Sequence, residues 1–152
     1  MAQIGKKAPA FSLENQDGKK IKLGDFAGRK VVLFAFPKAN TSGCTKQACG
    51  FRDEMPRLKH ANAVVLGISP DKPATLLKWK QKEKLPYDLL SDPEHKVLAK
   101  YGAWGEKSMY GKKYEGVIRS HFIIDEEGRL VDAQIKVSPA DSVERATAFL
   151  AG

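Results

Sequence analysis

The sequence predicts an α/β fold, a three-layer sandwich with a central mixed sheet and an N-terminal β-hairpin. Two continuous apolar runs, residues 30–36 and 63–69, are typical of strands buried on both faces of a sheet. A helical segment follows each run, and this β-α-β order favours parallel strands. A hairpin pattern over residues 119–137 adds antiparallel strands, so we expect the sheet to be mixed.

The N-terminal segment is expected to form a hairpin. Residues 10–13 and 20–23 flank the sequence Asn-Gln-Asp-Gly, and Asp-Gly favours a tight turn. The first apolar run follows and ends at Pro37, which has no N–H to donate to a sheet. A helix is predicted from about residue 43 to residue 60. It should kink near Pro56, because proline cannot donate a hydrogen bond inside a helix.

The middle of the chain repeats the strand-helix order. The second apolar run, residues 63–69, leads into a helix predicted over about residues 71–84, with Pro73 at an early position that suits proline. A short strand at residues 89–91 and a helix around residues 94–101 are expected next.

The C-terminal part is expected to close the sheet. Residues 119–125 and 129–137 form a hairpin around the turn Glu-Glu-Gly, and Ser138-Pro139 opens a last helix. These elements together predict a thioredoxin-like sandwich that forms a single domain over residues 1–152.

Composition sets broad limits on the function. With 152 residues and 42% hydrophobic content the chain fits one core, and we find no linker, repeat or low-complexity segment. The N-terminus carries no apolar signal segment, and the longest apolar run, residues 31–36, is too short to span a bilayer. We therefore expect no membrane partner and a cytoplasmic location. The formal charge of +8 is spread over the whole chain among acidic residues, which argues against nucleic-acid binding but allows steering of anionic partners.

The two cysteines, Cys44 and Cys49, lie five residues apart where the first apolar strand gives way to a helix. A thiol in the first turn of a helix meets unpaired N–H groups and the positive end of the helix dipole, which favour the thiolate. Cys44 is therefore a candidate nucleophile.

The spacing of the two cysteines also predicts a conformational change. Residues five apart in a helix are separated by about 8.6 Å at Cα, whereas a disulfide needs about 7 Å or less. If Cys44 and Cys49 bond to each other, the first turns of the helix must unwind. A structural role for such a disulfide is a poor alternative, because so short a loop constrains little chain entropy.

The residues around the cysteines resemble a known family. The pattern of proline, three residues, threonine, two residues and cysteine, here Pro37, Thr41 and Cys44, resembles the active-site motif of the peroxiredoxins. The position of Cys49 is similar to that of the resolving cysteine in the bacterioferritin comigratory protein or PrxQ branch. The resemblance continues in two further stretches, residues 101–114 and 116–125.

This resemblance implies a thiol-dependent peroxidase of the atypical two-cysteine kind, acting in antioxidant defence on hydrogen peroxide and alkyl hydroperoxides. The Cys44 thiolate would attack a peroxide oxygen and become a sulfenic acid. Cys49 would then form an intramolecular disulfide with it, and thioredoxin or a similar dithiol would reduce that disulfide. The reaction needs no cofactor and no metal.

The resemblance also implies roles for the residues around the thiol. Arg119 would hold the thiolate and polarise the peroxide. The Thr41 hydroxyl would exchange hydrogen bonds with both, and the N–H groups of Gly43 and Cys44 would receive the anion. Pro37 would shield the pocket from water.

Three positions depart from the pattern of this branch. Ser42 stands in place of a second proline, so the loop before the thiol is less restrained. Gln47 replaces a glutamate, which removes a negative charge near the thiol and favours the thiolate. His121 occupies a position usually held by threonine, and its effect depends on which face of the sheet it lies on.

Three other hypotheses remain open. A general thiol–disulfide oxidoreductase would share the fold, but this chain has no Cys-x-x-Cys motif. A redox-switched holdase would use the unwinding to expose apolar surface such as Phe51. A metal site built from the two cysteines and a histidine is a further alternative, although the three histidines lie far apart in the sequence. We expect a monomer, with a dimer as the alternative.

Overall fold

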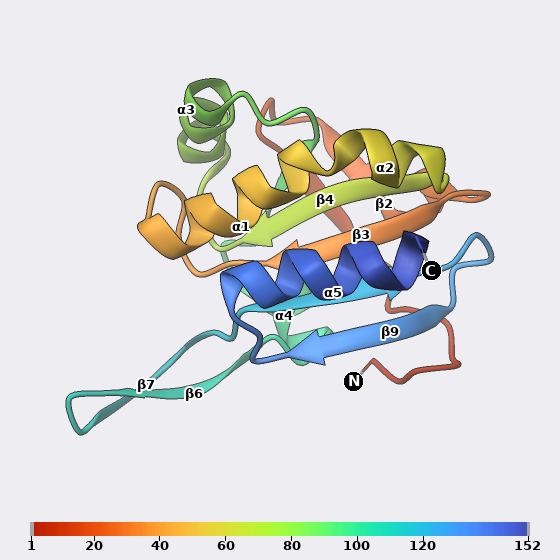
Figure 1. Ribbon diagram of the computed structural model, residues 1–152. Helices are drawn as coiled ribbons and strands as arrows, with labels where there is room; N and C mark the ends of the chain where they lie inside the picture. The colour runs from red at the N-terminus through yellow and green to blue at the C-terminus, as the bar shows by residue number, and fades with distance from the viewer. Residues whose placement is uncertain (1, 152) are drawn as a thin grey trace.

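The computed structural model describes residues 2–151. One sheet of seven strands forms the centre of the molecule, in the spatial order β2-β1-β5-β4-β3-β8-β9 (Figure 1). Its strands are β1 (Ser12–Asn15), β2 (Lys20–Lys22), β3 (Lys30–Ala35), β4 (Ala63–Ser69), β5 (Asp88–Ser91), β8 (Ser120–Ile124) and β9 (Leu130–Ile135).

The directions of the strands confirm the mixed sheet. Strand β3 is parallel to β4, and β4 is parallel to β5, as the β-α-β order predicts. Strand β8 runs antiparallel to β3 and to β9, so the C-terminal hairpin joins the sheet beside the first apolar strand. The N-terminal hairpin of β1 and β2 joins the sheet through β5.

Helices cover both faces of the sheet and contribute to the two outer layers of the predicted three-layer sandwich. The helices are α1 (Ser42–Asp53), α2 (Met55–His60), α3 (Pro73–Glu83), α4 (Lys96–Lys100) and α5 (Pro139–Ala151). Helices α1, α2, α3 and α5 contribute side chains to the core on one face, and α1, α2 and α5 lie side by side there (Figure 1). On the other face α4 and the N-terminal segment pack against the alternate side chains of the same strands.

The core beneath α1 is aromatic. Phe34 of β3 and Phe36, which directly follows β3, are fully buried, and Phe34 stacks on Phe51 of α1 with ring centroids 5.0 Å apart. Trp79 of α3 packs on Phe36 at 5.0 Å. Burying each of these side chains stabilises the fold by roughly 1.5–3 kcal/mol. Helix α1 therefore packs on a buried aromatic core.

The predicted kink is a complete break between two helices. Helix α1 ends at Asp53, and Glu54 is both its C-cap and the N-cap of α2. Pro56 stands at the start of α2, where its missing N–H would have no helical partner in any case. The break separates the segment that carries both cysteines from the rest of the predicted helix.

Two elements were not predicted. Strands β6 (Trp104–Met109) and β7 (Lys112–Val117) form a separate two-stranded hairpin that extends away from the body of the molecule (Figure 1). A short 3-10 helix, η1 (Leu23–Phe26), follows β2. Within the described residues 2–151, no helix is long and apolar enough to cross a membrane.

Candidate active site

Cys44 lies in the first turn of α1, two residues after the start of that helix. Its side chain is almost fully buried, with 1% exposure, and belongs to the aromatic core cluster beneath α1. The thiol is free. An anionic sulfur at this position would face the unpaired N–H groups of the helix start, as the sequence predicts.

Arg119 is the charged group that meets this sulfur. Its Nη2 lies 3.3 Å from Cys44 Sγ. The register of the sheet explains the contact: Ser120 of β8 pairs with Ala35 of β3, so Arg119 lies beside the end of β3, where the chain turns toward α1. The positively charged guanidinium therefore lies against the sulfur of Cys44.

Gly43 makes room for the guanidinium. A Cβ atom at this position would lie 3.1 Å from Arg119 Nη2 and 3.6 Å from Pro139 Cγ. The absent side chain thus lets Arg119 reach the first turn of α1. The other terminal nitrogen of the guanidinium, Nη1, donates a hydrogen bond of 2.7 Å to Gln47 Oε1.

Thr41 and Pro37 lie in the loop between β3 and α1. Thr41 is the N-cap residue of α1, and its exposed hydroxyl donates to the carbonyl of Lys38 at 2.8 Å instead of capping the helix. Its oxygen keeps lone pairs that can accept a hydrogen bond. Pro37 is half-buried and directly follows Phe36, whose N–H donates to Ile68 of β4.

Cys49 lies on the side of α1 that faces α3. It is a free, half-buried thiol, and its Sγ donates to Glu83 Oε1 at 3.5 Å. Burial raises the pKa of the Cys49 thiol, the Glu83 carboxylate raises it further, and Arg52 acts in the opposite direction. In this structure α1 is helical between the two cysteines, so Cys49 is held as a neutral thiol apart from Cys44.

Several polar contacts from α3 and the loop that follows it hold α1 in place. Tyr87 donates to the carbonyl of Ala48 at 2.6 Å, and Arg52 donates to the carbonyl of Glu83 at 2.6 Å. Trp79 Nε1 donates to Thr45 at 3.3 Å, and Lys82 donates to Asn40 at 2.8 Å. Unwinding of α1 is opposed by the contacts that Thr45, Ala48 and Arg52 make, and the contact at Asn40 holds the loop before the helix.

Sequence reasoning missed one buried residue at the site, Ser142 of α5. Its Oγ lies 3.0 Å from Gln47 Nε2 and 2.8 Å from His121 Nδ1. The side chain of His121 therefore lies on the face of β8 covered by α5. The only signal in the sequence is a small polar residue four positions before Ala146, on the buried side of the last helix.

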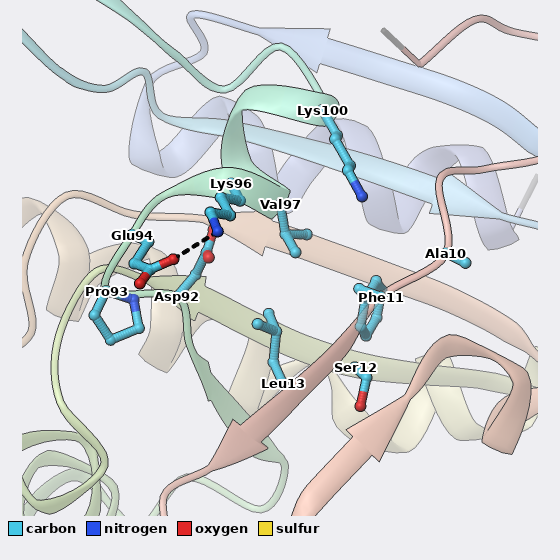
Figure 2. A pocket seen from close by; sticks show the side chains of 10 residues that line it. All are labelled: Ala10, Phe11, Ser12, Leu13, Asp92, Pro93, Glu94, Lys96, Val97 and Lys100. Carbon is cyan, nitrogen blue, oxygen red and sulfur yellow. Dashed lines mark ion pairs between the residues drawn. The ribbon is translucent and has the colours of Figure 1, made fainter.

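Two cavities differ in their relation to the candidate site. One of about 590 Å³ is lined by Arg119 together with residues of β6 and of the segment that leads into α5, and so lies beside the guanidinium that contacts Cys44. Another, of about 640 Å³, lies between the N-terminal segment and α4 (Figure 2). Phe11, Leu13 and Val97 line it, and an ion pair of 2.9 Å joins Glu94 to Lys96 at its edge. None of the residues predicted for the active site borders this second cavity.

The described part of the chain, residues 2–151, contains no cluster of three or more His, Cys, Asp or Glu side chains arranged to hold a metal ion. Within residues 2–151, the hydrogen bonds that connect His121 to Cys44 run through Ser142, Gln47 and Arg119. The alternative of a cysteine–histidine metal site has no support from this geometry.

Comparison with known proteins places this geometry in a family. The AhpC/TSA family matches residues 4–133, a stretch that holds both cysteines and Arg119. The chain is a peroxiredoxin of this family. This peroxiredoxin is similar to peroxiredoxin Bcp of Escherichia coli, with 51% identity over 128 residues, which are 84% of this chain and 82% of that protein. A putative peroxiredoxin of Mycobacterium tuberculosis is 48% identical over 93% of this chain and 90% of its own length.

Solved structures agree with the sequence relatives. The bacterioferritin comigratory protein of Xanthomonas campestris, studied for its alkyl peroxide reduction, superposes with a TM-score of 0.90 at 29% identity, over 97% of each chain. The predicted family and thioredoxin-like fold of this peroxiredoxin are thus confirmed, and it is a thiol-dependent peroxidase.

Proposed function

We propose that this peroxiredoxin reduces hydrogen peroxide and alkyl hydroperoxides with Cys44 as its nucleophile. The contact of 3.3 Å between Arg119 Nη2 and Cys44 Sγ, at the start of α1, carries this assignment. The thiolate attacks the terminal oxygen of the peroxide, and a sulfur–oxygen bond forms as the oxygen–oxygen bond breaks. Sulfur is oxidised to the sulfenic acid, and the leaving oxygen takes a proton and departs as water or an alcohol.

Arg119 serves both the thiolate and the transition state. Its charge favours the anionic sulfur before the attack, and its donors favour the negative charge that moves onto the leaving oxygen. The N–H groups of Gly43 and Cys44 at the start of α1 receive charge on the same side. Thr41 contributes an acceptor oxygen, and Pro37 excludes water from the loop.

Cys49 resolves the sulfenic acid. Its thiol loses a proton, its sulfur bonds to Cys44 Sγ, and the sulfenic oxygen leaves as water. Residues five apart in a helix are about 8.6 Å apart at Cα, so α1 unwinds before this bond can form. A thioredoxin-type dithiol then reduces the disulfide by exchange. We propose a monomer as the working unit.

Peroxide consumption with thioredoxin, thioredoxin reductase and NADPH tests the proposal, with Cys44→Ser as the control. We expect many turnovers by the natural chain and none by the variant. Turnover that survives in Cys44→Ser would overturn the assignment of the nucleophile. Reduction of insulin disulfides without peroxide turnover would instead support a general oxidoreductase, and a single oxidation without cycling would support a redox-switched holdase.

Glu83 is expected to restrain the reactivity of Cys49. In a Cys44→Ser background, Glu83→Gln removes the carboxylate charge that raises the pKa of the Cys49 thiol, whereas the backbone bond from Arg52 to residue 83 remains. Alkylation of Cys49 by iodoacetamide near pH 8 should become about threefold faster, the size expected for a partly solvated charge interaction.

The matched control for this prediction is Glu94→Gln, which removes an exposed carboxylate at the cavity beside α4. It should leave the alkylation rate of Cys49 unchanged. An unchanged alkylation rate in Glu83→Gln as well would show that the Glu83 carboxylate does not restrain the reactivity of the Cys49 thiol.

A further inference from the structure

A line of buried polar side chains runs from Arg119 into the core. Gln47 accepts from Arg119 through Oε1 at 2.7 Å and approaches Ser142 Oγ through Nε2 at 3.0 Å. Ser142 in turn lies 2.8 Å from His121 Nδ1. Gln47, Ser142 and His121 are all fully buried, at 0% exposure, and come from α1, α5 and β8. Two departures from the branch pattern, Gln47 and His121, are thus members of one network.

The direction of every hydrogen bond in this line follows from Arg119. A guanidinium only donates, so Gln47 accepts through Oε1 and its Nε2 must donate to Ser142. The hydroxyl of Ser142 is then free to donate to Nδ1 of a neutral His121, which carries its proton on Nε2. That Nε2 faces Asp132 Oδ2 of β9 at 3.8 Å.

The charge state of His121 agrees with this direction. Burial lowers the pKa of His121 to about 4, the carboxylate of Asp132 opposes the shift, and Arg145 of α5 supports it. The ring is therefore neutral near pH 7 and can accept at Nδ1. These are the charged groups that act on the ring from β9 and from α5.

We propose that Ser142 and His121 are positioning residues, which act through Gln47 to hold the Arg119 guanidinium against Cys44 Sγ. The inference rests on the role proposed above for Arg119. Movement of Gln47 away from Arg119 would break its bonds to Arg119 and to Ser142 and leave the buried amide of Gln47 without partners, which is costly. Helix α5 thereby becomes part of the active site without touching the peroxide.

The neutral amide of Gln47 positions the Arg119 guanidinium without reducing its charge. A carboxylate there would pair with the guanidinium and neutralise part of its charge. An amide orients the same guanidinium but carries no charge. The positive charge of Arg119 can therefore stabilise the sulfur and the leaving oxygen.

The test compares two losses of a buried hydroxyl on α5. Ser142→Ala breaks the line, whereas Thr147→Val removes a buried hydroxyl that has no hydrogen-bond partner among residues 2–151. We expect Ser142→Ala to shift the pH midpoint of Cys44 alkylation upward and to lower kcat/KM for hydrogen peroxide about tenfold, the scale of one lost buried hydrogen bond. Thr147→Val should change neither quantity.

A second pair of variants tests the same line from β8. In His121→Asn the side-chain oxygen takes the place of the Nδ1 acceptor, so the alkylation profile should stay near that of the natural chain. His121→Leu removes the acceptor and should shift the profile as Ser142→Ala does. This pair decides the question even if Ser142→Ala does not fold.

The outcomes separate this inference from the proposed function. If the pH midpoint of Cys44 alkylation shifts in Arg119→Met but is unchanged in Ser142→Ala and His121→Leu, the positioning role alone would be overturned. If the pH midpoint is also unchanged in Arg119→Met, the role of Arg119 itself would be overturned.

Discussion

Arg119→Met is expected to lower kcat/KM for hydrogen peroxide by about 10²–10³, the loss typical of removing a donor that stabilises a developing oxyanion. Methionine fills a similar volume but has neither charge nor N–H groups, so Cys44 Sγ loses the partner that lies 3.3 Å away. The leaving oxygen loses the same partner. Stopped-flow measurement of peroxide-dependent oxidation of Cys44 gives the rate directly, without dependence on the reductant.

Arg119→Lys is the matched control for this prediction. Lysine keeps the positive charge but cannot contact Cys44 and Gln47 at the same time with two nitrogens, as Arg119 does. We expect an intermediate rate. A rate equal to that of the natural chain in Arg119→Met would show that the guanidinium has no part in the attack.

Cys49→Ser is expected to abolish thioredoxin-dependent turnover but to leave the first oxidation intact. Cys44 should consume one equivalent of peroxide and then remain a sulfenic acid, which dimedone traps and mass spectrometry detects. Cys44 Sγ and Arg119 keep their contact in this variant, because Cys49 lies on the side of α1 that faces Glu83. The rate of the first oxidation should therefore match that of the natural chain.

An external thiol provides the control for this variant. Dithiothreitol attacks the sulfenic acid directly, so it should restore turnover in Cys49→Ser. Excess peroxide without thiol should drive Cys44 on to the sulfinic acid. Sustained turnover with thioredoxin alone would contradict the resolving role of Cys49.

Most of the sheet could be predicted because its signals are local. The apolar runs of β3 and β4 are long and uninterrupted, and Pro37, Pro56 and Pro73 mark where helices and strands begin or end. The hairpin of β6 and β7 has no such signal. Its strands are rich in Lys, Glu and Gly, and within residues 2–151 they pair only with each other. The turn between them lies at Tyr110-Gly111, where both φ angles are positive.

The site could be predicted only in part, for a related reason. The motif around Cys44 is continuous in the sequence, and the resemblance to the family supplied Arg119. The partners of Cys49 and Gln47 depend on how α3 and α5 pack across α1, which no local pattern reports. Likewise, the hydrogen bond from Thr41 to Lys38 depends on the conformation of the loop and not on the identity of the residues.

The break at Glu54 also bears on how long each catalytic cycle lasts. Helix α1 is only 12 residues long, and helix–coil relaxation of short peptides takes about 0.1–1 μs. Enzymes typically turn over at about 1–10³ s⁻¹, so winding and unwinding of such a helix occupy a negligible share of the proposed cycle. We expect release of the contacts that Tyr87 and Arg52 make with their partner carbonyls to be the slower event. On this expectation, the contacts that hold α1 limit the rate of the conformational step more than the helix itself does.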